Sequence, residues 1–140
     1  MKSYKFNYKD KTYELSKDNC DYILLSHEEN EITGIELSDV LELLNECTEV
    51  SFDPTYYSEP CEKCLNGKGE KLKYFNFLEY HFCIFTKNNK YVISNISKEY
   101  ENTSFSKLLK LGKIDNSFVL MIIVCENCGN YAIEIEQCDI

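Results

Sequence analysis

Two short motifs place a pair of cysteines at the same spacing. Cys61 and Cys64 form the first motif, and Cys125 and Cys128 form the second. A CxxC turn points two thiolates at one centre, and two such turns supply the four sulfur ligands that zinc binds tetrahedrally at about 2.3 Å. Gly129 follows the second motif directly, where a positive φ lets backbone N–H groups turn toward the sulfurs. We therefore expect Cys61, Cys64, Cys125 and Cys128 to bind one structural metal ion, with zinc preferred.

Iron and disulfide exchange are the alternatives for these cysteines. Rubredoxin-type iron sites also use two CxxC turns. A redox dithiol commonly lies at a helix N-terminus, which lowers the thiol pKa, and neither motif opens a clear helix. The 60 residues between Cys64 and Cys125 exceed the gap in compact zinc ribbons. Long loops are tolerated, however, because each doubling of loop length costs only about 0.6 kcal/mol in closure entropy.

Catalytic patterns are weak. The chain has 2 histidines and neither a glycine-rich phosphate loop nor a serine in a nucleophile elbow. Four cysteines also close the coordination sphere that a catalytic zinc leaves open. We therefore favour a binding or adaptor module over a redox protein or an enzyme with an unrecognised site. His81 and Cys83 could be alternative ligands on one strand face, but a packed or surface histidine is the preferred interpretation. Tyr56 and Tyr57 could anchor a protein partner or pack around the first cysteine turn.

Length and charge restrict the class of protein further. The 140 residues, 44% of them hydrophobic, suit a single domain, and the net charge of −9 repels phosphate backbones, so nucleic acid is not the expected partner. The basic cluster between Lys63 and Lys73 is expected to be a solvated loop. The N-terminus lacks the apolar core of a signal peptide, and the longest apolar run, 118–125, is too short to span a membrane. We expect a cytoplasmic protein, in which paired cysteines indicate metal rather than disulfides.

The pattern of elements predicts an α+β fold with one antiparallel sheet and two short helices. Alternating aromatic residues from Tyr4, a turn at Asp10-Lys11 and a second run to Leu15 predict a hairpin. Ser38 is a good N-cap for a helix with Leu37, Val40, Leu41, Leu44 and Cys47 on one face. The segment 22–25 fits a strand or a helical turn equally, 27–31 reads as a loop, and the stretch around Pro54 and Pro60 as irregular.

The second half of the chain is expected to be mostly strand. Residues 77–87 alternate, Asn88-Asn89 suits a tight turn, and 91–93 completes a second hairpin. Thr103 or Ser104 caps a short helix that ends near Gly112. The apolar run 117–124 is the predicted central strand, and 131–135 is the last one.

Four stretches of the chain resemble a known group of proteins. They are Pro60-Cys-Glu-Lys-Cys64, Glu79-Tyr-His-Phe82, Glu99-Tyr-Glu-Asn-Thr-Ser-Phe105 and Val124-Cys-Glu-Asn-Cys-Gly129. Together they resemble a small family of uncharacterised bacterial proteins of about this length from low-GC Gram-positive anaerobes, a domain of unknown function. The resemblance implies a single-domain protein and no particular activity. The two cysteine motifs also resemble zinc-ribbon turns, although the long insertion departs from that pattern.

Overall fold

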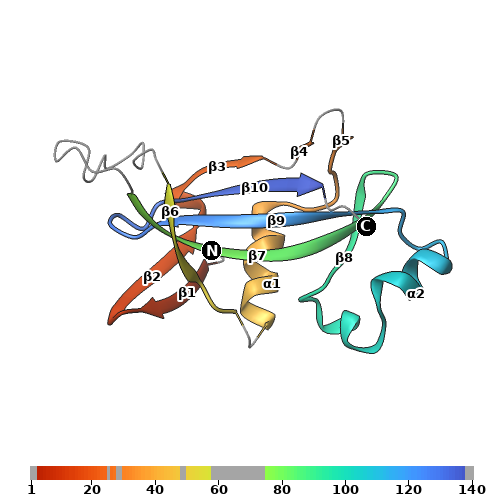
Figure 1. Cartoon of the computed structure of the whole chain (residues 1–140), viewed down its shortest axis with the longest axis horizontal. Coiled ribbons are helices and arrows are strands. Elements are labelled where there is room, and N and C mark those ends of the chain that lie inside the picture. The colour runs from red at the N-terminus through yellow and green to blue at the C-terminus, as the bar shows by residue number, and fades with distance from the viewer. Residues whose placement is uncertain (1–2, 25, 28–29, 48–49, 58–74, 138–140) are drawn as a thin grey trace.

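The computed structural model describes residues 3–24, 26–27, 30–47, 50–57 and 75–137, and these form a sheet-rich α+β fold (Figure 1). The helices are α1 (Leu37–Glu46) and α2 (Phe105–Lys110), with 3₁₀ turns at Lys17–Asn19 and Lys98–Asn102. The strands are β1 (Ser3–Tyr8), β2 (Lys11–Ser16), β3 (Cys20–Leu24), β4 (Ser26–His27), β5 (Asn30–Glu31), β6 (Asp53–Tyr57), β7 (Phe75–Lys87), β8 (Lys90–Ser94), β9 (Asn116–Cys125) and β10 (Tyr131–Gln137).

The main sheet has six strands and is mixed. Its order is β3-β10-β9-β7-β6, and β8 pairs with the other half of the long strand β7. The predicted central strand, β9, does lie between two partners, β7 and β10. Its even-numbered residues from Phe118 to Val124 are buried, whereas Val119, Met121 and Ile123 on the other face are only partly buried. All these pairings are antiparallel except that of β3 with β10, which is parallel. The expectation of a wholly antiparallel sheet was therefore wrong at this edge.

The first hairpin, β1–β2, forms as predicted, but its turn lies one residue earlier than expected. Lys9 and Asp10 have φ of 48° and 65°, which is the backbone of a two-residue turn that matches the twist of the strands. Asn88 and Asn89 repeat this geometry, with φ of 52° and 64°, in the predicted turn between β7 and β8.

Helix α1 covers one face of the main sheet and passes behind β7 and β9 in the view of Figure 1. Its buried residues are Val40, Leu41 and Leu44, as the helical spacing predicted. They join one core with even-numbered residues of β7 and β9 and with the hairpin; its largest members include Tyr131, Phe118, Leu15, Leu78, Leu120 and Ile122. The N-cap is Glu36 rather than Ser38, and the N–H of Glu36 donates to Asp39 Oδ2 at 2.8 Å.

Three other expectations about local structure need correction, and one open alternative is decided. Residues 53–57 form β6, although Pro54 suggested irregular chain; an edge strand tolerates a proline because one side of it needs no donor. Residues 26–27 pair with 30–31 where a loop was expected. Residues 22–24 belong to a strand, which was one of the two alternatives for this segment. Cys47 caps the end of α1 and is only partly buried, so it is not a core residue.

The opposite side of the main sheet, which we call the outer face, carries the odd-numbered residues of β6, β7 and β9 and the even-numbered residues of β10. At its far end, α2 packs through Leu108 against Phe85 and Ile114. Ser104 caps α2 as predicted, accepting a hydrogen bond from Lys107 N–H at 3.2 Å, and Gly112 follows with a φ of 70°. The end of the outer face near β6 is therefore the part that α1 and α2 leave uncovered.

Candidate functional site

The second cysteine motif forms a tight turn between β9 and β10, which we call the cysteine turn (residues 125–129). Gly129 N–H donates to Cys125 O at 3.0 Å, and Cys125 N–H donates to Asn130 O at 2.8 Å. Gly129 has a φ of 81°, as the sequence predicted. Cys125 is only 4% exposed, whereas Cys128 is exposed. The turn thus holds one thiol at the protein interior and the other at the surface.

Side chains from the N-terminal part of the chain hold the carbonyl groups of the cysteine turn. Lys11 Nζ donates to Glu126 O at 3.1 Å and to Asn127 O at 2.7 Å. Tyr13 Oη donates to Glu126 O at 2.8 Å, and Asn19 Nδ2 donates to Gly129 O at 3.1 Å. Lys11 Nζ also lies 4.9 Å from the centre of the Tyr13 ring, within range of a cation–π interaction. The conformation of the turn is therefore fixed from outside by four hydrogen bonds.

These contacts also set the direction of the N–H groups in the turn. In a planar trans peptide, the C=O of one residue and the N–H of the next point in opposite directions, and none of the described peptide bonds is cis. The carbonyls of Glu126 and Asn127 point to the hairpin, so the N–H groups of Asn127 and Cys128 point away from it. In a metal-binding CxxC turn, N–H groups are directed away from the carbonyl side in this way and donate to a thiolate.

The first motif, Cys61 and Cys64, lies outside the described residues, as does the basic cluster between Lys63 and Lys73. The two chain positions that flank it are nevertheless defined. Tyr57, the last residue of β6, pairs with Phe75, the first residue of β7, and Phe77 pairs with Cys125. The described residues, which include only two of the four predicted ligands, contain no group of three or more His, Cys, Asp or Glu side chains placed to hold a metal ion.

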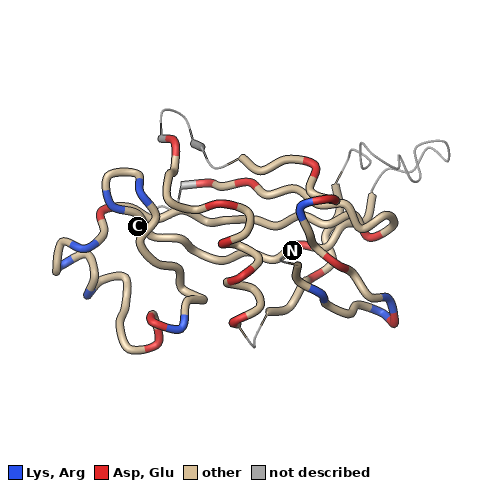
Figure 2. The backbone as a smooth tube through the Cα atoms, turned by 180° about the vertical axis from the view of Figure 1, so that it is seen from behind, with Lys and Arg blue, Asp and Glu red and all other residues tan. Residues whose placement is uncertain are grey.

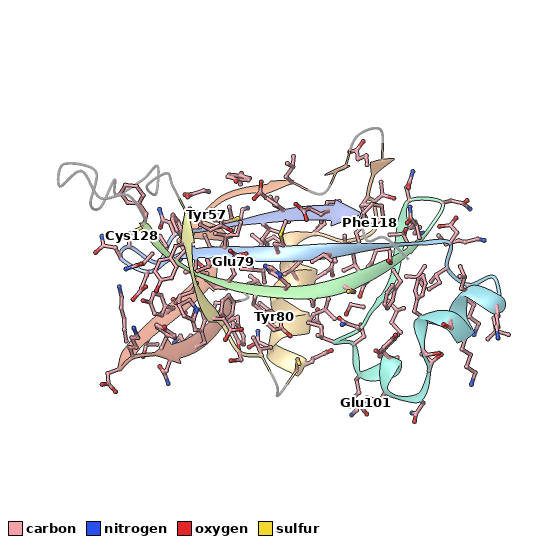
Figure 3. The ribbon with its side chains drawn as sticks, in the orientation of Figure 1. Tyr57, Glu79, Tyr80, Glu101, Phe118 and Cys128 are labelled. Atoms are coloured by element: carbon pink, nitrogen blue, oxygen red, sulfur yellow. The ribbon has the colours of Figure 1, made fainter. Side chains whose placement is uncertain are left out.

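A second cluster of polar side chains lies on the outer face close to the cysteine turn. Glu79 is its centre: Tyr57 Oη donates to Glu79 Oε2, and His81 Nε2 lies 2.6 Å from Glu79 Oε1. Tyr57 also contacts the Phe77 ring edge-on, with ring centroids 5.2 Å apart. Glu79 is 13% exposed and His81 50% exposed. Tyr57, Glu79 and Cys128 lie at the same end of the molecule in Figure 3.

The pKa of Glu79 reflects this network. Partial burial alone would raise it, but hydrogen bonds from Tyr57, His81 and Thr55, together with the charge of His81, outweigh burial and lower the pKa. Glu79 is therefore ionised at neutral pH. Burial, the hydrogen bond to Glu79 and the charges of Glu79 and Glu134 raise the pKa of Tyr57, which keeps its hydroxyl a donor.

A pocket of about 370 Å³ adjoins this cluster. Its lining consists of Ser51, Asp53, Pro54, Thr55, Glu79, Tyr80 and His81. The volume is at the low end of the range for small-ligand sites, roughly 300–1,000 Å³. The spacing of Glu79 and His81, two residues apart on a strand, indicates that their side chains share a face. The hydrogen bond from Tyr57 to Glu79 depends on the register of β6 against β7, which the sequence did not predict.

Other residues singled out by the sequence lie elsewhere. Cys83 is on the outer face with His81, and its backbone contacts Asn95: Asn95 Oδ1 accepts from Cys83 N–H at 2.9 Å, and Asn95 N–H donates to Cys83 O at 3.0 Å. Tyr56 is 64% exposed and points away from Tyr57, because neighbouring residues of a strand face opposite sides. Among the described residues, no helix is long and apolar enough to cross a membrane.

Fold and site together define a small α+β protein in which a rigid cysteine turn and a polar pocket share one end of a mixed sheet. The chain belongs to the family described as protein of unknown function (DUF3785), whose model matches residues 4–140. No curated protein and no solved structure matches the chain. The family resemblance expected from the sequence is therefore confirmed, whereas the resemblance to zinc ribbons gains no support from these comparisons.

Proposed function

We propose that the protein is a small binding module stabilised by one zinc ion, which Cys61, Cys64, Cys125 and Cys128 bind. The observation that carries this proposal is the register of three neighbouring strands. β6 ends and β7 begins beside the position where β9 reaches Cys125, because Tyr57 pairs with Phe75 and Phe77 pairs with Cys125. The chain that contains the first motif thus starts and ends at the edge where the cysteine turn lies.

The distances along the chain are compatible with a shared metal. Tyr57 and Cys125 are two strands and two residues apart, which corresponds to about 12 Å at usual sheet spacings. Cys61 is the fourth residue after Tyr57, and four extended residues reach about 14 Å. Phe75 is the eleventh residue after Cys64, so the return path is longer still. Both cysteines of the first motif are within reach of the second.

The same strand order accounts for the long gap between the two motifs. β7 runs away from the cysteine turn, β8 and α2 follow at the far end, and β9 runs back to Cys125. Residues 75–124, most of this gap, are one passage along the sheet and back, not an insertion into a compact ribbon. The proposed site would tie the cysteine turn to the segment that begins after Tyr57 and ends before Phe75.

Four thiolates would close the coordination sphere, which supports a structural role for the metal. The N–H groups of Asn127 and Cys128 are turned away from Lys11, and in this proposal they face the thiolates and stabilise their charge. Iron is the alternative metal for this ligand set and would indicate electron transfer instead.

Metal analysis of protein expressed without added zinc tests the proposal, together with Cys61→Ser and Cys125→Ser. The expected result is one zinc per chain in the wild type and loss of that zinc in both variants. Stoichiometric iron would overturn the zinc assignment and would indicate an electron-transfer protein instead of a binding module. Metal-free wild type that is as stable as zinc-loaded protein would overturn the proposal.

A second candidate function, an acid–base enzyme, is favoured by one observation: the Glu79–His81 pair adjoins the pocket. In such an enzyme Glu79 orients His81, which accepts a proton from a substrate. Comparing wild type with His81→Gln on a panel of ester and amide substrates tests it. A rate that disappears in the variant would support an enzyme, and equal rates would exclude this pair as its centre.

A further inference from the structure

The end of α2 and the turn that follows it, which we call the α2 tip (residues 107–113), form one extremity of the molecule along its longest axis (Figure 1). Every residue of the α2 tip except Leu108 is exposed. Two of the exposed residues are large and apolar: Leu109 is 42% exposed and Leu111 is 60% exposed. Single exposed leucines are ordinary on a protein surface, but these two lie within three residues at a projecting point. The α2 tip therefore presents apolar side chains where a flat surface can reach them.

The packing of α2 on the sheet is made by other apolar residues. Leu108 packs with Phe85 and Ile114, and the ring centroids of Phe105 and Phe85 are 5.2 Å apart. These contacts hold α2 in place and leave the exposed leucines at its end. The two leucines are therefore available to a partner at no cost to this cluster.

The backbone of the α2 tip is well satisfied. The N–H groups of Leu111, Gly112 and Lys113 donate to the carbonyl oxygens of residues 107, 109 and 108, at distances of 3.0–3.1 Å. The last carbonyl groups of a helix otherwise need water or another donor. The α2 tip can consequently lose water at these carbonyls without leaving them unsatisfied.

The α2 tip is also basic, although the whole chain has a net charge of −9. Residues 102–114 contain three lysines and no acidic residue. The three are Lys107, Lys110 and Lys113. Figure 2 shows lysines gathered around α2 and the neighbouring turn between β7 and β8, with acidic residues more numerous between the two ends of the molecule.

The β7–β8 turn brings two more lysines to this end. Asn88 N–H donates to Asp115 Oδ2 at 3.0 Å, and this contact joins the turn to the chain that follows the α2 tip. Lys87 and Lys90 flank the turn, directly opposite each other in the ladder, and both are exposed. Like charges in this position destabilise a hairpin. An anionic partner at this end would relieve the repulsion.

The acidic residues elsewhere do not cancel the charge of the α2 tip. Exposed charges are largely screened beyond about 8 Å at physiological ionic strength. β9 has ten residues, or about 34 Å, between the side of the α2 tip and the cysteine turn. Glu101, in the turn that leads into α2, lies at the lower edge of Figure 3 rather than at the α2 tip.

We propose that the α2 tip binds the surface of an anionic lipid bilayer, with Leu109 and Leu111 between the headgroups and the lysines against lipid phosphates. Charge complementarity requires an anionic partner. The exposed leucines favour lipid over nucleic acid, which is bound through basic, polar and aromatic side chains. Such a contact lies on the bilayer and needs no spanning segment. The inference goes beyond the proposed function, since it uses none of the four cysteines and leaves the cysteine turn at the other end of β9.

Flotation of the full-length protein with lipid vesicles tests this inference. Vesicles of phosphatidylcholine and phosphatidylglycerol in a ratio of about two to one are compared with vesicles of phosphatidylcholine alone. Binding should be at least about tenfold stronger to the anionic vesicles and should weaken as salt is added. Equal binding to both vesicles, or binding to neither, would overturn the proposal.

Variants of the protein provide a second measurement. Lys107→Gln and Lys110→Gln should each weaken binding about fivefold, since one lysine near an anionic surface contributes about 1 kcal/mol; Lys5→Gln, on the first hairpin, is the control. Leu111→Gln should weaken binding about tenfold by removing apolar contact. Leu24→Gln, on β3 and at 47% similarly exposed, should leave binding unchanged. Equal binding by the tip variants and their controls would show that the α2 tip is not the site.

A fluorescent reporter distinguishes a bilayer from other anionic partners. The chain contains no tryptophan, so Leu111→Trp places a single indole at the α2 tip and Leu24→Trp places one on β3. Anionic vesicles should shift the emission of the first variant to shorter wavelength, because its indole leaves water, and leave the second unchanged. Vesicle binding without this shift, or equally strong binding of poly-glutamate, would overturn the lipid assignment. Zinc content of each sample is measured in parallel, so that failure of the metal assignment and failure of lipid binding are seen separately.

Discussion

Lys11 Nζ and the carbonyl oxygen of Asn127 are 2.7 Å apart, although the two residues are separated by 116 positions in the chain. The contact joins the first hairpin to the turn that carries Cys125 and Cys128. With Tyr13 and Asn19, it makes the conformation of that turn depend on the N-terminal residues. Loosening the cysteine turn should therefore also disturb the first hairpin.

Lys11→Met should lower zinc affinity while leaving the sheet intact. The substitution keeps the aliphatic stem but removes two donors to the turn, and groups that orient metal ligands typically contribute about 10- to 100-fold in affinity. Competition with a chromophoric chelator measures this. Lys5→Met is the matched control. Lys5 is on the same hairpin, but the contact of its Nζ is an exposed ion pair with Glu14 Oε2 at 3.7 Å, not a hydrogen bond to the cysteine turn. Equal zinc affinity in both variants would contradict a role of Lys11 at the site.

Gly129→Ala and Gly112→Ala should have similar effects on stability but different effects on metal binding. Both glycines have positive φ, 81° and 70°, so an alanine costs about 1–2 kcal/mol at either position. A new Cβ at Gly129 would lie 3.9 Å from the Tyr13 ring, an ordinary contact, and at Gly112 it would meet nothing. Thermal unfolding and zinc titration of both variants separate the backbone strain from its consequence at the cysteine turn. Zinc affinity should fall only in Gly129→Ala.

Cys125→Ser and Cys47→Ser should separate a metal ligand from a structural cysteine. Loss of Cys125 should release the zinc and lower the stability by more than about 3 kcal/mol, or on the order of 10 °C in melting temperature. Cys47 is partly exposed at the end of α1, so serine there should cost less than about 0.5 kcal/mol. Calorimetry with metal analysis on each variant gives both quantities. Full zinc content in Cys125→Ser would rule out the four-cysteine site.

Glu79→Gln should reduce stability at neutral pH and lose this effect in acid. The pKa of Glu79 is lowered in the folded protein, so its ionised form stabilises the fold above the unfolded value of 4.5. That contribution disappears as the pH falls through the folded pKa. We expect a cost of about 1–3 kcal/mol at pH 7, which shrinks below pH 4.5. Denaturant unfolding across pH 3–7, with Glu136→Gln for comparison, measures it; a pH-independent difference would contradict the linkage.

Much of the fold could be predicted from local patterns. Alternation predicted β1–β2, β7–β8 and β10, and helical spacing predicted the buried residues of α1, because burial on one face requires those periods. β6 was missed because its five residues include Pro54 and lack clear alternation. The parallel pairing of β3 was missed because partner choice depends on residues more than 100 positions away.

The candidate site was predictable to a different extent. The CxxC motifs can be recognised from their spacing alone, and Gly129 has the positive φ that its place after the second motif predicted. To predict the hydrogen bond from Tyr57 to Glu79, one must know the register of β6. To predict the hydrogen bonds that Lys11 and Tyr13 donate to the cysteine turn, one must know where the hairpin lies. Neither the register nor the hairpin position can be read from the local sequence. Glu79 and His81 could have been paired from their spacing, but nothing marked that spacing as different from other polar alternations.

β10 occupies an interior place in the sheet, between β3 and β9, although it is the last strand in chain order. During synthesis on the ribosome, β3 has no partner until residues 131–137 have emerged. More than 100 further residues are made between the end of β3 and the start of β10. The nascent chain can therefore pair β6, β7 and β8 early and add β9 next, but it can attach β3 to the sheet only after β10 has emerged.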